Sequence, residues 1–131
     1  MDIKHEYPPN IEEIRETLKP DNDAVFTYGN VIYNPSGAVI GKHLLVHETI
    51  HSKQQGEDPA KWWECYLKDP QFRLEQEVEA YVSQYKFVRL TASSKYAESF
   101  LEEIVEYLSG KMYGNIITAP KAKTLIRHRA R

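Results

Sequence analysis

Apolar residues recur at helical spacing along most of the chain after Gly41, whereas the segment before it alternates short apolar runs with turn-forming residues. Within residues 8–18, Asn10 suits a helix N-cap and the apolar residues share one side. A short amphipathic helix is therefore expected there, and Pro20 ends it.

Residues 24–33 are rich in β-branched and aromatic side chains around the turn-forming pair Gly29–Asn30. A second turn at 34–37 precedes the apolar run 38–40. These segments predict a small antiparallel sheet of two or three strands near the N-terminus. Residues 115–118 are a weaker strand candidate.

Five more helices are expected after Gly41. Two of them begin at acid–proline pairs, which combine an N-cap with proline at the first helical position. The chain shows no internal repeat and no convincing linker, so residues 1–131 are expected to form one domain of the α+β class that is mainly helical. The expected helices are 41–55, one from Pro59, one from Pro70 to about Leu90, one from Ser93 or Ser94 to Leu108, and a short one after Pro120.

Composition and charge are those of a folded globular protein, with 41% hydrophobic and 27% charged residues. The net charge of -2 is too small to indicate a polyanionic partner. The basic segment 121–131 could contact nucleic acid, but a short basic end more commonly complements the negative pole at a helix C-terminus. Nucleic acid is therefore not the expected partner.

Cys65 is the only cysteine, which excludes an intrachain disulfide and a zinc site built from cysteines. No apolar run has the length of a membrane span, and the N-terminus has no apolar core of a signal peptide. A reducing, cytoplasmic setting is expected, without contact with a membrane.

The candidate chemistry lies in the helix expected at 41–55. His47 and His51 are four residues apart, so both imidazoles project from one side of the helix. With Glu48 they form the H-E-x-x-H pattern, in which two histidines bind Zn²⁺ and the glutamate takes a proton from zinc-bound water. The alternative is a solvated helix with ordinary surface histidines. Apolar residues on the same side argue against it, because a buried imidazole needs a partner.

His43 continues the four-residue spacing but is not expected to be a ligand, because three histidines would then span about 12 Å along the helix. A catalytic zinc site usually has a third protein ligand. Of the glutamates at 75, 77 and 79, only Glu77 lies in the middle of the apolar side of its helix, where a carboxylate is costly unless paired. Glu77 is the expected ligand, and an ion pair with Arg73 is the alternative.

These residues resemble the metal-binding motif of a known protein family. H-E-x-x-H followed by a glutamate in an E-x-x-A setting, here residues 77–80, resembles the gluzincin branch of the zincin metallopeptidases. More broadly, the chain is similar to small zincin-like metallopeptidases of bacteria and phages, over about 40 residues from His43 to Tyr85. Where many gluzincins carry an aspartate four residues after the glutamate ligand, this chain has Tyr81.

The resemblance implies a zinc-dependent peptidase with a zincin-like fold that acts on a peptide or protein substrate, in the host cytoplasm if phage-encoded. Zn²⁺ would be held by His47, His51 and Glu77, and Glu48 would be the general base. Tyr81, Tyr113 and His128 are unranked candidates for a second donor to the transition state, and a strand within 25–33 or 38–40 is expected to offer its edge to the substrate.

Three alternatives stay open. Trp62 and Trp63 could line the substrate site or belong to the core. The zinc site could stabilise an interaction module that has no catalytic activity. Less expected is a nucleic-acid-associated factor that acts through the basic C-terminal segment. The sequence does not indicate an oligomeric state.

Overall fold

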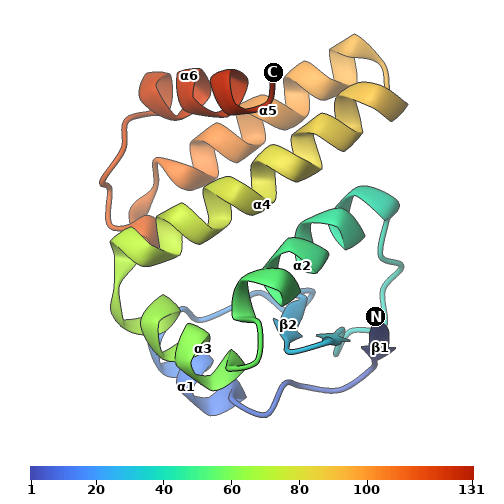
Figure 1. The fold of residues 1–131 in the computed structure, drawn as a ribbon, viewed down its shortest axis with the longest axis vertical. Coiled ribbons are helices and arrows are strands. Elements are labelled where there is room, and N and C mark those ends of the chain that lie inside the picture. The colour runs from blue at the N-terminus through green and yellow to red at the C-terminus, as the bar shows by residue number, and fades with distance from the viewer.

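The computed structural model describes residues 1–131 and is mainly helical, with six α-helices and a small sheet near the N-terminus (Figure 1). The predicted α+β class is confirmed. The helices are α1 (Ile11–Thr17), α2 (Lys42–Gln55), α3 (Pro59–Lys68), α4 (Pro70–Thr91), α5 (Ser94–Leu108) and α6 (Ala119–Arg129), with one 3-10 turn, η1 (Lys111–Tyr113). The strands are β1 (Asp2–Lys4), β2 (Phe26–Tyr28) and β3 (Val31–Tyr33).

The sheet is mixed, whereas the sequence predicts an antiparallel one. Strands β2 and β3 form the expected antiparallel hairpin around Gly29, whose φ of 64° suits glycine. Strand β1 was not predicted and pairs with β3 in parallel, so the strand order is β1-β3-β2. Every residue of β1 is exposed, which leaves no apolar pattern to indicate a strand.

The run 38–40, expected as a possible third strand of the sheet, and the weaker candidate 115–118 form no strand. Residues 34–38 are held as a loop by the side chain of Asn34, whose Nδ2 donates to the carbonyl of Ala38 at 2.7 Å. Val39 is 99% exposed, and the sheet contains only β1, β3 and β2, so the run 38–40 pairs with no strand.

Side-chain caps explain most helix starts. Asp58 and Asp69 accept hydrogen bonds from backbone N–H groups in the first turns of α3 and α4, as the acid–proline pairs predict. Ser93 caps α5 in the same way. Asn10 does not cap α1: its φ and ψ of -103° and 24° are not extended, and both polar atoms of its side chain are buried without a hydrogen-bond partner.

Two apolar clusters form the core, and they are joined by the long helix α4. One lies among α4, α5 and α6 and includes Leu101 and Ile126. The other lies among α1, the β2–β3 hairpin and α3, and it contains Trp62 and Trp63. Both tryptophans are therefore core residues, and both also line the cavity that holds His47 and His51, so the two expected roles coexist. Helix α2 packs against both β2 and α4 and so lies between the sheet and the longest helix (Figure 1). None of the helices combines the length and apolar character needed to cross a bilayer.

Candidate metal centre

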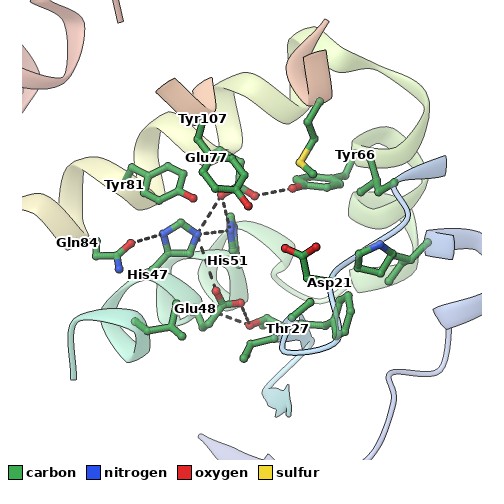
Figure 2. A pocket seen from close by; sticks show the side chains of 18 of the residues that line it. Asp21, Thr27, His47, Glu48, His51, Tyr66, Glu77, Tyr81, Gln84 and Tyr107 are labelled. Atoms are coloured by element: carbon green, nitrogen blue, oxygen red, sulfur yellow. Dashed lines mark hydrogen bonds and ion pairs between the residues drawn. The ribbon is translucent and has the colours of Figure 1, made fainter. Parts of the chain in front are cut away.

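Two neighbouring helices bring together the three residues that the sequence predicts as metal ligands (Figure 2). Helix α2 supplies His47 and His51, and α4 supplies Glu77 from across the helix interface. The Nε2 atoms of the two histidines lie 3.1 Å apart, and Oε1 of Glu77 is 3.0 Å from one and 3.1 Å from the other. All three residues are buried, with relative exposures of 5–6%.

The tautomers of both histidines follow from the amide oxygens beside them. Nδ1 of His47 lies 2.8 Å from Oε1 of Gln84, and Nδ1 of His51 lies 2.8 Å from Oε1 of Gln54. An amide oxygen only accepts, so each imidazole donates from Nδ1. In the neutral rings, both Nε2 atoms therefore point a lone pair at the carboxylate of Glu77.

This arrangement fits a divalent metal ion. Two imidazole nitrogens and one carboxylate oxygen are a donor set that zinc takes, and tetrahedral bonds of 2.0–2.1 Å would place such donors about 3.3 Å apart. The observed separations of 3.0–3.1 Å differ from that by a few tenths of an ångström. Three lone-pair donors at this spacing repel one another unless a cation lies between them. The residues present therefore fit a zinc ion.

Without a metal, a proton provides that positive charge. Burial alone lowers the pKa of His51, but the carboxylate of Glu77 outweighs it with the help of Glu48, and the pKa is raised from 6.5 to about 9. Burial alone raises the pKa of Glu77, yet the two histidines hold it well below its usual range. The site thus attracts a cation even in the metal-free protein.

The second oxygen of Glu77 has its own partner. Tyr66, on α3, donates a hydrogen bond of 2.6 Å to Oε2. The alternative ion pair between Glu77 and Arg73 is not formed, because the guanidinium of Arg73 donates instead to the backbone carbonyls of Tyr66, Leu67 and Met112. Arg73 therefore closes the C-terminal end of α3, and Glu77 is free to face the histidines.

Glu48 lies beside the three candidate ligands without joining them. It is 5% exposed, and its Oε1 accepts a hydrogen bond of 2.9 Å from Oγ1 of Thr27 on β2. Its Oε2 is 3.8 Å from Nε2 of His47. One carboxylate oxygen is thus tied to the sheet, and the other faces the histidine (Figure 2).

The remaining predicted residues fall into two groups. The ring of Tyr81 packs edge-on against His47 with centroids 4.5 Å apart, and its hydroxyl points toward the cluster (Figure 2). Tyr113 is buried and lines the same cavity. His128 is exposed on α6 and does not line that cavity, so it is not part of the site. His43 is not among the candidate ligands; it lies in the first turn of α2, and its Nδ1 accepts from the amide of Gln84 at 2.8 Å.

The cluster lies in a cavity of about 500 Å³. Its walls come from the 18–27 segment, α2, α3, α4, α5 and the turn at η1, and most of the lining residues are apolar. Three acids near its mouth, Asp21, Asp23 and Glu103, are exposed and form no ion pair, whereas Lys19 is the single lysine or arginine in the lining. In Figure 2 the carboxylate of Asp21 points into the space in front of the cluster.

Hydrogen bonds within the protein already occupy part of the edge of β2. The carbonyl of Thr27 accepts hydrogen bonds from Nε2 of Gln55 at 2.8 Å and from Nε1 of Trp63 at 3.0 Å. A substrate strand could not also use this carbonyl without displacing one of them. Of the two edges expected for a substrate, 38–40 is no strand and β2 is occupied at this point.

Four residues of the site were not predicted, namely Thr27, Gln54, Tyr66 and Gln84. Helical spacing could have found two of them, because Gln84 lies seven residues after Glu77 on α4 and Gln54 lies seven residues after His47 on α2, in each case on the same side of the helix. Tyr66 and Thr27 come from other elements, and only tertiary packing brings them here.

No protein-family model, no curated protein and no solved structure matches the chain. What the structure shows is a buried group of two histidines and one glutamate, able to hold a metal ion, in a mainly helical fold. Membership of the gluzincin branch stays a prediction.

Proposed function

We propose that the chain is a zinc-dependent hydrolase, and specifically a metallopeptidase that acts on a peptide or protein substrate. The observation that carries this proposal is the position of Glu48, whose free carboxylate oxygen lies in the same cavity as His47, His51 and Glu77. A purely structural zinc site needs no carboxylate in that place.

Each group of the site would have its own role. His47, His51 and Glu77 would hold the ion, which when bound acts as a Lewis acid and lowers the pKa of water. Glu48 accepts a proton at Oε2, because its Oε1 is held by Thr27. The apolar lining of the cavity limits the access of bulk water to these groups.

Tyr81 and Tyr113 are the proposed second donors. Burial and the nearby charge of Glu77 raise the pKa of both phenols well above the usual value. Each hydroxyl therefore keeps its proton at any ordinary pH and can donate it in a hydrogen bond to a developing oxyanion.

One observation favours a second candidate function, a zinc-stabilised interaction module without catalytic activity. The three candidate ligands join α2 to α4, so a bound ion would hold these two packed helices together and stabilise the fold by itself. The nucleic-acid alternative has less support, because Lys123 and Arg127 of the basic segment pair with Glu98 and Glu102 on α5.

The test is a comparison of the wild-type protein with Glu48→Gln. Both proteins should bind one zinc ion per chain, as measured by metal analysis after dialysis. Cleavage of an unfolded protein substrate, followed by mass spectrometry, should fall by about 10²- to 10⁴-fold in the variant, the usual contribution of a general base. Equal cleavage by both proteins would disprove the role of Glu48. Zinc binding without any cleavage by the wild type would favour the interaction module.

A further inference from the structure

Each candidate ligand histidine is held by a glutamine, and the glutamine on α2 can adopt only one orientation. Nε2 of Gln54 donates to the backbone carbonyl of Gln76 at 3.0 Å and to the carboxylate of Glu79 at 2.9 Å. Both partners are acceptors only, so the NH₂ end of the amide must face them. The oxygen of Gln54 must then face Nδ1 of His51.

The glutamine on α4 is held through a third histidine. Gln84 is 4% exposed and lies between two imidazoles, with Oε1 toward His47 and Nε2 toward Nδ1 of His43. Rotation of this amide would present NH₂ to Nδ1 of His47. The proton of His47 would then have to move to Nε2, the atom that faces the other ligands. An Nε2 that carries a proton cannot bind a metal ion.

We propose that Gln54 and Gln84 are positioning residues, which fix the Nδ1–H tautomer of His51 and His47 and so present both Nε2 lone pairs to a metal ion. His43 takes part in its Nε2–H tautomer, in which Nδ1 accepts from Gln84 and keeps that amide in the productive orientation. This inference rests on the metal centre of the proposed function, but it does not require catalysis. It also explains how the site works without an aspartate four residues after Glu77: neutral amides orient the histidines instead.

The first test measures zinc affinity by competition with a chelator. Gln54→Met and Gln84→Met keep the length of the side chain but remove the acceptor, and each should weaken zinc binding by about 10- to 100-fold. Gln84→Glu restores an acceptor and should bind zinc at least as tightly as the wild type. Gln71→Met, at an exposed position of α4, is the matched control and should change nothing.

The second test uses NMR of the zinc-bound, ¹⁵N-labelled protein. The wild type should show a slowly exchanging Nδ1–H signal for each ligand histidine. Gln54→Met should lose protection at His51 alone, and Gln84→Met at His47 alone. His43→Phe keeps an aromatic ring beside Phe100 and should affect His47 only, with a loss of zinc affinity below tenfold. A merely structural glutamine would not produce this reciprocal pattern.

The outcomes separate the two proposals. Wild-type affinity in folded Gln84→Met and Gln54→Met, checked by circular dichroism, would overturn the positioning role and leave the metal centre intact. If either methionine variant fails to fold, the corresponding alanine variant and His43→Phe decide the question in the same assay. A wild-type chain that binds no zinc would overturn both the metal centre and this inference.

Discussion

The phenol of Tyr66 donates to Oε2 of Glu77 at 2.6 Å, while Oε1 of the same carboxylate faces His47 and His51. The two oxygens of Glu77 thus serve different purposes: one is held by α3 and the other is directed at the ion site. Burial and the charge of Glu77 raise the pKa of Tyr66 well above its usual value, so this donor is present at all ordinary pH values.

Loss of this phenol should weaken the metal site. We expect Tyr66→Phe to lower zinc affinity by about tenfold, because Glu77 loses the group that orients it. The folded protein should also lose about 1.5–3 kcal/mol, the usual contribution of a hydrogen bond to a charged group. Chelator competition and urea denaturation measure the two effects. Tyr33→Phe, a core phenol with no hydrogen bond to the site, is the control; equal zinc affinity in both variants would contradict the orienting role.

The metal-free protein should lose stability as the pH rises. The pKa of His51 is raised from 6.5 in the unfolded chain to about 9 in the folded one, so the folded state binds the proton more tightly. The stabilisation is complete below about pH 6.5 and disappears as the pH passes through about 9; it amounts to roughly 3 kcal/mol. Urea denaturation of chelator-treated protein between pH 6 and 9.5 measures it.

His51→Gln serves as the control for that titration, and its stability should vary much less over the same interval. Zinc replaces the proton, so the zinc-bound wild type should also lose this pH dependence, and apparent zinc affinity should increase with pH up to about 9. A metal-free wild type whose stability is constant from pH 6.5 to 9 would show that His51 is not protonated as the geometry requires.

The hydroxyl of Thr27 should matter for catalysis and not for metal binding. Thr27→Val keeps the shape of the side chain but removes the hydrogen bond to Oε1 of Glu48, so the proposed base is less well oriented. Peptidase activity should fall by about tenfold, with zinc affinity unchanged. Thr49→Val, which removes a hydroxyl bonded to the carbonyl of Leu45 on the same helix as Glu48, is the comparison. A parallel loss in both variants would argue against a specific role of Thr27.

The charge at the cavity mouth predicts a preference for basic substrates. Asp21, Asp23 and Glu103 outnumber Lys19, and opposite charges on a substrate gain from this field at low ionic strength. Peptides with lysine or arginine near the scissile bond should be cleaved several-fold faster than acidic ones, and added salt should reduce the difference. The double variant Asp21→Asn, Asp23→Asn should lose the preference, whereas Glu57→Gln, outside the cavity, should keep it. Faster cleavage of acidic peptides by the wild type would disprove the preference for basic substrates.

The candidate metal ligands could be predicted from sequence because helical geometry alone constrains them. The spacing of His47 and His51 places two imidazoles one turn apart, and the position of Glu77 in an apolar stripe marks a carboxylate that needs a partner. The structure brings all three together. Most helix starts were likewise predictable, since acid–proline pairs and serine caps act within one turn.

The remaining features depend on contacts between distant segments. Strand β1 has no apolar alternation, because its pairing uses the backbone while its side chains stay in solvent. Asn10 looks like a cap in sequence, but the local backbone turns its side chain away from the N–H groups. The glutamines beside the histidines are common polar residues, and their role follows only from the packing of α2 against α4.

The candidate ligands His51 and Glu77 are 26 positions apart, and the whole of α3 lies between them. An ion that binds both would close residues 51–77 into a loop. Loop closure reduces the number of conformations open to the unfolded chain, as a disulfide does. A chain whose single cysteine cannot form a disulfide with itself would thereby gain a reversible cross-link. The cross-link would be present or absent according to the supply of free metal rather than the redox state of the surroundings.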